Sequence, residues 1–232
     1  MEKIQGKVIY ITGGTKGIGL GIATSAIENG MKVAISGRHI DTKTESLFPT
    51  DSWLTIKSDV KNENDELIAI KSILDKWGRL DVLVANAGVG HFGPIDLLTS
   101  DQWHETIDTN LTGVFNSVKA SIPALKVSKG YIITMASLAG TNFFTNGGAY
   151  NASKFGLVGF SQAIMLDLRP YQIKVTTIMP GSVATYFNNH LPDAKDHWKI
   201  QPEDIGQMVI DLLQMNPRTL PSKIEVRPSQ TS

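Results

Sequence analysis

The stretch Thr12-Gly13-Gly14-Thr15-Lys16-Gly17-Ile18-Gly19 decides the fold class of this 232-residue chain. It follows a short apolar run, Val8–Ile11, and leads into a segment with helical spacing, Ile18–Asn29. Three of its glycines, spaced by four and two residues, therefore join a predicted strand to a predicted helix. Glycine accepts positive φ and lets a ligand approach the backbone, and the N terminus of the helix offers free N–H groups to phosphate. This is a GxxxGxG variant of the dinucleotide-binding turn, although a lone glycine motif also occurs in ordinary strand-to-helix turns.

Outward from this turn, apolar β-branched runs alternate with helical segments along the rest of the chain. The runs are near-continuous, which is typical of parallel strands covered on both faces. We therefore predict one α/β domain over residues 1–232, a Rossmann-type doubly wound parallel sheet with helices on both faces. The predicted strands are Val8–Ile11, Val33–Ser36, Trp53–Ile56, Val82–Val84, Tyr131–Thr134, Val175–Met179 and Ile224–Val226; the predicted helices are Ile18–Asn29, Glu63–Trp77, Asp101–Leu125, Ala152–Leu168 and Pro202–Gln214.

Two stretches between these elements are irregular. Residues 41–52 have room for only a turn or two of helix. Residues 186–202 carry apolar side chains without a clear period, and we expect them to form a short substrate loop or lid.

Composition excludes several classes of function. Lys plus Arg and Asp plus Glu both number 22, so no overall charge draws the chain to nucleic acid or to anionic lipid. The absence of cysteine excludes disulfides and thiolate chemistry, and the five histidines show no metal-ligand spacing, so no metal site is expected. No apolar run approaches the ~20 residues that a membrane-spanning helix needs. We expect a cytoplasmic protein.

The end of the second strand indicates which coenzyme is preferred. Folds that prefer NAD(H) usually place a carboxylate there for the ribose 2′-hydroxyl, but this chain has Gly37. Arg38 follows, and Lys16 lies in the glycine turn. Two cations without a carboxylate favour a 2′-phosphate, and hence NADP(H) over NAD(H). The alternative is that both are ordinary solvated surface charges.

The segment Tyr150-Asn151-Ala152-Ser153-Lys154 supplies acid–base chemistry. Residues i and i+4 share a helix face, and a nearby ammonium lowers the pKa of a tyrosine, which would let Tyr150 exchange a proton with a substrate oxygen near pH 7. Ser137 follows the predicted fifth strand, where its hydroxyl would polarise a carbonyl. Taken alone, a YxxxK pair is more often an ordinary exposed helix pair, and a serine such as Ser137 is a loop or helix-capping residue.

Further polar or glycine-containing segments follow other strands. Asn86-Ala87-Gly88 follows the fourth strand and Pro180–Thr185 the sixth, and each is an ordinary turn if taken alone. Asn110 lies within the long predicted helix, where asparagine is a mediocre helix former. Aromatic side chains at three places are expected to meet at one pocket mouth, or else to be ordinary packing. They follow the NAG turn, Ser137 and Thr185: Phe92 (beside His91), Phe143, Phe144, Tyr186 and Phe187.

These elements occur in one order along the chain: TGGTKGIG (12–19), NAG (86–88), Asn110, Ser137, YNASK (150–154) and PGSVAT (180–185). In that order and spacing, the chain resembles the short-chain dehydrogenase/reductase family over nearly its whole length. The resemblance implies a seven-stranded parallel sheet with three helices on each face. It also implies a homodimer or homotetramer packed through the two long helices.

The resemblance further implies catalytic roles for four residues. Tyr150 would be the general acid/base, and Lys154 would lower its pKa and hold the nicotinamide ribose. Ser137 would position the substrate oxygen, and Asn110 would support a water-linked proton relay to Lys154.

Coenzyme contacts are implied in the same way. Asp59 and Val60 would contact the adenine, Asn86 and Gly88 would line the adenine ribose and nicotinamide side, and Val183 and Thr185 would bind the carboxamide. The full predicted coenzyme set is Gly13, Thr15, Lys16, Gly17, Ile18, Gly19, Arg38, Asp59, Val60, Asn86, Ala87, Gly88, Tyr150, Lys154, Pro180, Gly181, Val183 and Thr185.

The sequence therefore predicts an NADP(H)-dependent oxidoreductase that interconverts a carbonyl and a secondary alcohol. The substrate is left open between a small ketone, aldehyde or hydroxy acid and a 3-oxoacyl thioester. In the thioester case, Lys126, Lys129 and Arg169 are candidates to bind an acidic carrier protein. The alternative in another class is a non-catalytic NADP-binding sensor or scaffold, although the serine, tyrosine and lysine are all retained.

Overall fold

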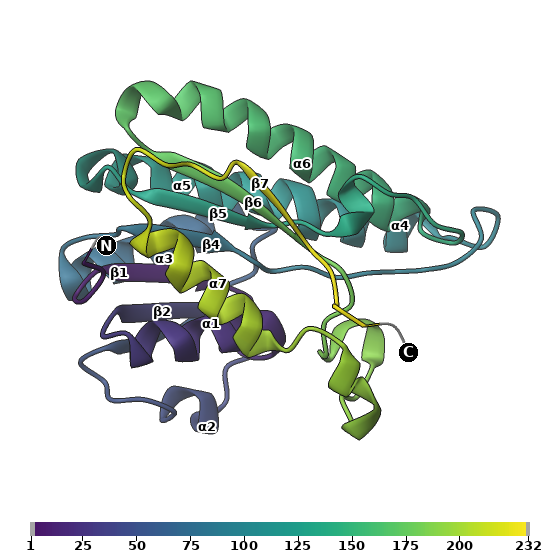
Figure 1. The fold of residues 1–232 in the computed structure, drawn as a ribbon, viewed down its shortest axis with the longest axis horizontal. Helices are drawn as coiled ribbons and strands as arrows, with labels where there is room; N and C mark the ends of the chain where they lie inside the picture. The colour runs from purple at the N-terminus through teal and green to yellow at the C-terminus, as the bar shows by residue number, and fades with distance from the viewer. Residues whose placement is uncertain (1–2, 231–232) are drawn as a thin grey trace.

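A computed structural model describes residues 3–230 of the chain. Seven parallel strands form one sheet in the order β3-β2-β1-β4-β5-β6-β7 (Figure 1). All seven strand predictions are confirmed to within a few residues. The strands are β1 (Val8–Thr12), β2 (Lys32–Gly37), β3 (Trp53–Lys57), β4 (Val82–Ala85), β5 (Tyr131–Met135), β6 (Lys174–Pro180) and β7 (Lys223–Val226).

The first strand lies near the middle of the sheet because it pairs on both sides. Ile9 of β1 lies opposite Val33 of β2 on one side and Val82 of β4 on the other. All five residues of β1 are buried. Strands β2 and β3 are added on one side of β1, and strands β4 to β7 are added on the other. Such a topological switch point opens a crevice at the carboxyl ends of the strands.

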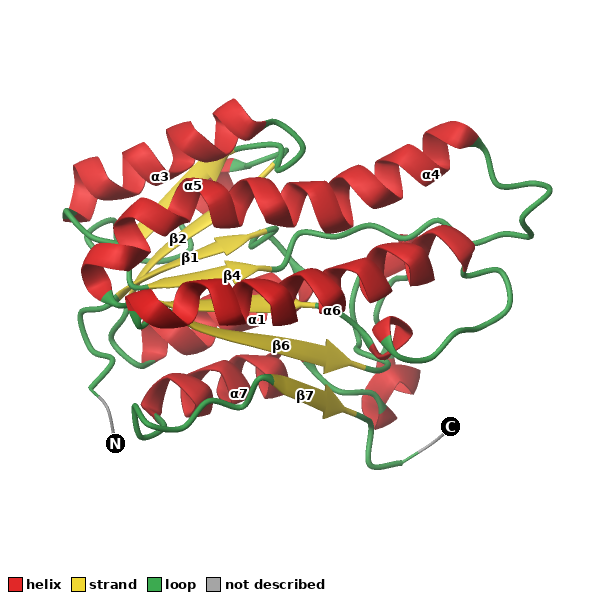
Figure 2. Ribbon diagram, turned by 90° about the horizontal axis from the view of Figure 1, so that it is seen from above, coloured by secondary structure: helices red, strands yellow, loops and turns green. Residues whose placement is uncertain are grey.

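Helices cover both faces of this sheet (Figure 2). On one face, α1 and α7 pack on side chains such as Ile9 and Val84. On the other face, α3, α5 and α6 pack on side chains such as Tyr10 and Leu83. The helices are α1 (Gly17–Glu28), α2 (Thr42–Glu45), α3 (Glu63–Trp77), α4 (Ser100–Ile107), α5 (Gly113–Ser128), α6 (Gly148–Leu168) and α7 (Pro202–Gln214).

Three details differ from the expectations. The face that carries α1 and α7 has no third long helix in the described residues; the single turn of α2 takes that place, as the short 41–52 stretch indicated. The segment predicted as one helix over Asp101–Leu125 is α4 and α5 joined by a π-helical turn, Asp108–Thr112. Finally, α6 begins at Gly148 rather than Ala152, so Tyr150 lies inside its first turn.

The strands point toward one end of the molecule, the right-hand end of Figure 2. The loops after β4, β5 and β6 leave the sheet at this end, and α1 and α6 begin there. Motifs from distant parts of the sequence therefore meet at this edge.

None of the helices within residues 3–230 is both long and apolar enough to cross a membrane.

Candidate active site

The glycine turn after β1 leaves the N terminus of α1 open to a ligand. Gly13 has φ of +65° and Gly17 has φ of +56°, a region that other residues rarely adopt. A Cβ on Gly19 would lie only 2.4 Å from the carbonyl oxygen of Gly13. Lys16 at the N-cap makes no side-chain hydrogen bond to the first turn of α1. The N–H groups of that turn therefore remain available for phosphate oxygens, which suits a dinucleotide.

The NAG turn after β4 is bonded to the glycine turn. The side-chain amide of Asn86 donates to the carbonyl oxygens of Thr12 (2.9 Å) and Gly13 (3.1 Å). In return, Thr12 Oγ1 accepts from the backbone N–H of Asn86 (3.0 Å) and of Ala87 (3.1 Å). The Asn86 side chain thus holds the two turns together, which leaves the backbone of this segment to contact a coenzyme.

Asn110 lies at the centre of the π-helical turn and is fully buried. Its Oδ1 accepts from the backbone N–H of Val89 at 2.8 Å, and its Nδ2 donates to Val89 O and to Ser153 Oγ. These bonds occupy the side chain, so a water-linked relay from Asn110 would have to use its backbone. Single π turns inside helices are frequent at functional sites. A Cβ on Gly88 would lie 3.3 Å from Asn110 Oδ1 and 3.8 Å from Lys154 Nζ. The NAG turn, Asn110 and the YNASK segment therefore meet at one place.

Tyr150 and Lys154 lie on one face of α6, with Ser137 opposite them. Lys154 Nζ donates to the carbonyl oxygen of Met135 at 2.9 Å and lies 5.6 Å from the centre of the Tyr150 ring. Ser137 precedes a single 3₁₀ turn, Leu138–Gly140, and its hydroxyl lies close enough to Tyr150 to lower the pKa of the phenol. A phenol, a hydroxyl and a buried ammonium therefore meet at one point.

Burial shifts the protonation of Tyr150 and of Lys154. It raises the pKa of Tyr150 to about 12, although the hydroxyl of Ser137 offsets part of the rise. Burial lowers the pKa of Lys154 to about 8. In the protein alone, burial therefore dominates the pKa of both groups, and the lowering of the Tyr150 pKa by Lys154 stays a prediction.

The segment after β6 closes the site on its other side. The hydroxyl of Ser137 lies 3.4 Å from the carbonyl oxygen of Pro180. A Cβ on Gly17 would lie 3.4 Å from the Cβ of Thr185, so the PGSVAT segment (180–185) runs from the serine to the glycine turn. Val183 pairs with Ile200 in an isolated bridge, which ties the base of the 186–202 loop.

The other end of the crevice holds the residues predicted to contact adenosine. Gly37 faces Thr15 of the glycine turn, since a Cβ on Gly37 would lie 2.9 Å from Thr15 Cγ2. Arg38 Nη1 lies 3.6 Å from Glu105 Oε1 of α4, and both side chains are partly exposed. Val60 is buried against Gly113, whereas Asp59 is partly exposed. The second cation, Lys16, lies 5.8 Å above the ring of Tyr186.

Glu105, His39 and Lys57 were not predicted from the sequence to belong to this region. Glu105 accepts from His91 Nε2 at 2.8 Å as well as facing Arg38, and His91 keeps the pKa of Glu105 below its usual range. A hollow of about 270 Å³ opens beside Arg38 and includes His39 and Lys57. No local motif marks these residues, because α4 and the ends of β2 and β3 come together only in the fold. Within residues 3–230 no group of three or more His, Cys, Asp or Glu side chains could hold a metal ion.

Fold and site together define a nicotinamide-dinucleotide oxidoreductase of the Rossmann type. The family model described as short chain dehydrogenase matches residues 7–196. The chain belongs to the short-chain dehydrogenase/reductase family.

Three similar proteins illustrate the range of this family. Trans-4-hydroxycyclohexanecarboxylate dehydrogenase of Sinomonas cyclohexanicum is 35% identical over 194 residues, which cover 79% of this chain and 75% of that protein. An alcohol dehydrogenase from the archaeon Thermococcus sibiricus, complexed with 5-hydroxy-NADP, superposes with a TM-score of 0.91 at 25% identity, covering 98% of this chain and 99% of that one. A 3-ketoacyl-(acyl-carrier-protein) reductase from Brucella melitensis, complexed with NADH, gives a TM-score of 0.88 at 25% identity, covering 97% and 98%.

Proposed function

We propose that this protein is an NADP(H)-dependent oxidoreductase that interconverts a small carbonyl compound and a secondary alcohol, with Tyr150 as the general acid and base. The observation that carries the proposal is the meeting of Ser137, Tyr150 and Lys154 beside Gly88, at the carboxyl edge of a sheet whose first turn is open to phosphate.

The residues of the crevice fit a nicotinamide dinucleotide. The first turn of α1, with Gly13 and Gly17, would hold the diphosphate, because its N–H groups are free and its glycines admit close approach. Arg38 would hold the 2′-phosphate together with Lys16. The remaining contacts follow the predicted set: Asp59, Val60 and residues 86–88 on the adenosine side, and Tyr150, Lys154, Val183 and Thr185 around the nicotinamide. When bound, the coenzyme supplies or accepts the hydride.

Tyr150 handles the proton in this proposal. With its pKa raised to about 12, the phenol is protonated at neutral pH, which suits donation to the oxygen of a carbonyl that is being reduced. Ser137 would hold the same oxygen by a hydrogen bond. The ammonium of Lys154 would stabilise the phenolate that remains until a proton from solvent restores the phenol.

The location of the basic residues weighs against the carrier-protein alternative. Arg169 directly follows the last residue of α6, whereas Tyr150 lies in its first turn, so roughly 28 Å of helix separates them. Lys126 lies at this same far end, with its Nζ 3.6 Å from the centre of the Tyr171 ring. A carrier protein docked there would face away from the site, which favours a small carbonyl or hydroxy compound as substrate.

Apolar side chains on α5 and α6 support association with a second copy of the chain. Phe115 and Phe155 are 44% and 43% exposed, and Leu166 is 59% exposed. Phe115 also contacts Phe160, with ring centres 6.3 Å apart. We propose that these two helices form the homodimer or homotetramer interface; a monomer in sedimentation velocity would contradict this.

A screen of carbonyl compounds with NADPH and NADH tests the enzymatic proposal. We expect oxidation of NADPH with at least one ketone or aldehyde and slower oxidation of NADH. Tight binding of NADPH without turnover of any carbonyl would instead support the sensor or scaffold alternative.

A further inference from the structure

Two phenylalanines contact the ring of Tyr150, and a third contacts one of these two. The centre of its ring lies 5.3 Å from that of Phe92 and 5.5 Å from that of Phe187. Phe92 in turn contacts Phe187 at 6.2 Å and Phe144 at 5.8 Å. We call Phe92, Phe144 and Phe187 the aromatic cluster. Its members come from the loops after β4, β5 and β6, so the expectation that aromatic residues of these loops meet is confirmed for these three.

The cluster lies against one side of the Tyr150 ring. A Cβ on Gly90 would lie 2.6 Å from Phe187 Cζ and 2.9 Å from Phe92 Cζ, so both rings press against this backbone. Tyr150 stays partly exposed beside these rings, so a carbonyl compound that reaches its hydroxyl meets Phe92 and Phe187. Phe187 belongs to the 186–202 loop and is followed by Asn188 with φ of +53°, whereas Phe92 is held between two other rings. Phe187 is the ring that a substrate would displace.

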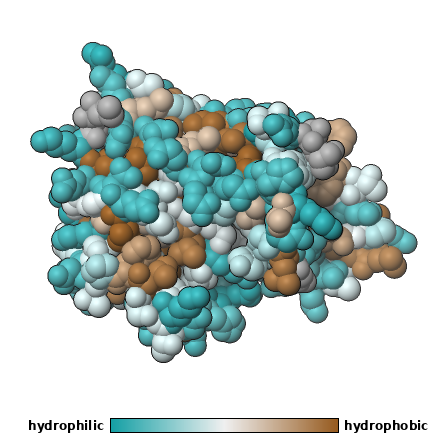
Figure 3. All heavy atoms as spheres, turned by 60° about the horizontal axis from the view of Figure 1, so that its bottom comes forward, coloured by the Kyte–Doolittle hydropathy of each residue, from teal (hydrophilic) through white to brown (hydrophobic). Residues whose placement is uncertain are grey.

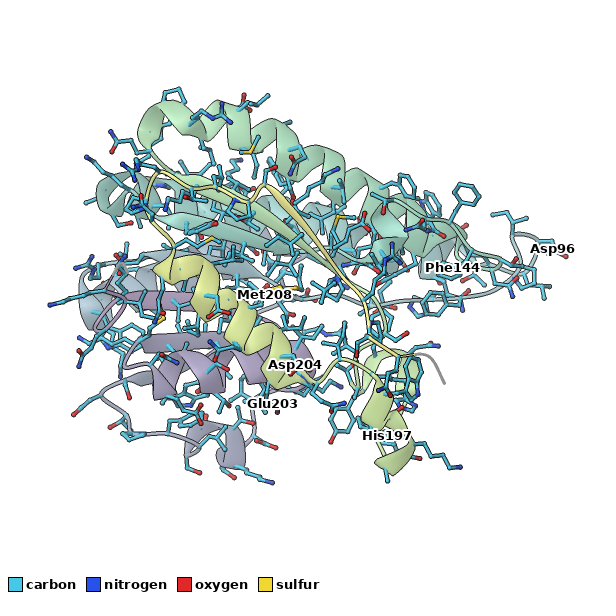
Figure 4. All side chains as sticks on the ribbon, viewed as in Figure 1. Asp96, Phe144, His197, Glu203, Asp204 and Met208 are labelled. Carbon is cyan, nitrogen blue, oxygen red and sulfur yellow. The ribbon has the colours of Figure 1, made fainter. Side chains whose placement is uncertain are left out.

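Apolar side chains continue outward from the cluster. Phe144 is 48% exposed, and Figure 4 shows it near the loop that carries Asp96. That loop is tied to the one before α6 by a hydrogen bond from Gly93 N to Asn146 O, 3.0 Å. Phe143 and Ile95 are 86% and 79% exposed. Figure 3 shows hydrophobic side chains at this end of the molecule.

Two basic side chains near the cluster already have hydrogen-bond partners. Lys154 donates to Met135 O, and His91 is bonded to Glu105. A carboxylate placed among the phenyl rings would lose much of its hydration, which is unfavourable for a charged group. An aryl group would instead recover the edge contacts that Phe187 gives up, because aromatic pairs attract beyond simple burial.

We propose that the substrate carries an aryl or bulky alkyl group on its carbonyl carbon, and that this group replaces Phe187 against Phe92 and Tyr150. Larger substituents would extend over Phe144. This inference rests on the proposed function and decides between its open substrates: it favours an apolar ketone over a hydroxy acid.

The test compares phenyl methyl ketone, butanone and pyruvate as substrates for NADPH oxidation. Each buried methylene is worth roughly fourfold in kcat/KM, so we expect the phenyl ketone to exceed butanone by at least roughly tenfold, and pyruvate to be the poorest of the three. Phe92→Leu keeps an apolar side chain but removes the ring, and it should lower the phenyl-to-butanone ratio by about fivefold. Phe144→Leu should lower the kcat/KM of a naphthyl ketone relative to butanone more than it lowers that of the phenyl ketone relative to butanone.

Tyr171→Leu is the matched control, because Tyr171 is 47% exposed and lies beyond the far end of α6. It should keep the parent ratios. Turnover of phenyl ketone and butanone at equal kcat/KM, preference for pyruvate, or an unchanged ratio in Phe92→Leu would each overturn the inference while the oxidoreductase assignment stands. Failure of every carbonyl to oxidise NADPH would overturn the proposed function itself.

Discussion

Lys154 Nζ lies 5.6 Å from the centre of the Tyr150 ring, yet its hydrogen bond goes to the backbone carbonyl of Met135. The ammonium is thus held near the phenol by the end of β5 rather than by the phenol itself. Burial lowers the pKa of Lys154 to about 8 and raises that of Tyr150 to about 12. In the free protein at neutral pH, the phenol is protonated and the lysine is largely charged.

This arrangement predicts a falling alkaline limb in the rate of carbonyl reduction. Lys154 is charged below pH 8 and neutral above it, so support for the developing phenolate is lost as pH rises through about 8. We expect kcat/KM for reduction to decline with a midpoint near pH 8. In Lys154→Arg the side chain stays charged, and the limb should move to higher pH. The exposed Lys126→Arg serves as control; a limb that stays at pH 8 in Lys154→Arg would assign it to another group.

Removal of the Tyr150 hydroxyl should separate chemistry from folding. Tyr150→Phe keeps the ring contacts with Phe92 and Phe187, so its midpoint of urea unfolding should match that of the parent. We expect kcat to fall by about 10²–10⁴-fold, because the general acid is gone, while the Kd for NADPH measured by fluorescence changes little. Undiminished turnover in this variant would remove Tyr150 from the mechanism.

The main features of the fold could be predicted because they depend on local pattern. Near-continuous apolar runs predict buried parallel strands, and an apolar period of 3.6 predicts α3 and α7 at their observed bounds. Tyr150 and Lys154 share a helix face through their spacing alone. The π turn around Asn110 gives no such local signal, because the turn and α4 pack against the distant helix α6.

Contacts between distant segments account for what could not be predicted. Glu105 faces Arg38 only because α4 passes over the end of β2. The direction of the Tyr150 pKa shift depends on burial, which the tyrosine–lysine spacing does not reveal. The sequence indicated that aromatic residues converge, but the contact between the rings of Phe187 and Tyr150 could be seen only in the structure.

The Arg38–Glu105 pair predicts how coenzyme preference responds to mutation. Both side chains are partly exposed, and such pairs contribute only about 0–1 kcal/mol, so a 2′-phosphate should readily displace Glu105 from Arg38. Arg38→Ala should raise KM for NADPH by roughly tenfold or more and leave KM for NADH nearly unchanged. Glu105→Gln should lower KM for NADPH a few-fold, since the competing carboxylate is gone. Equal effects of Arg38→Ala on both coenzymes would contradict a 2′-phosphate contact.

Asn86 should be needed for the geometry of the coenzyme crevice rather than for the chemical step. Its amide donates to Thr12 O and Gly13 O, so Asn86→Ala leaves two carbonyl oxygens without this donor and should cost about 1–3 kcal/mol in the free energy of unfolding. Asn86→Asp should cost more, because a carboxylate would then face two carbonyl oxygens at the same distances. Urea unfolding measures both costs, and the Kd for NADPH should weaken in the same order. If Asn86→Asp proves no less stable than Asn86→Ala, the side chain does not hold the two turns together.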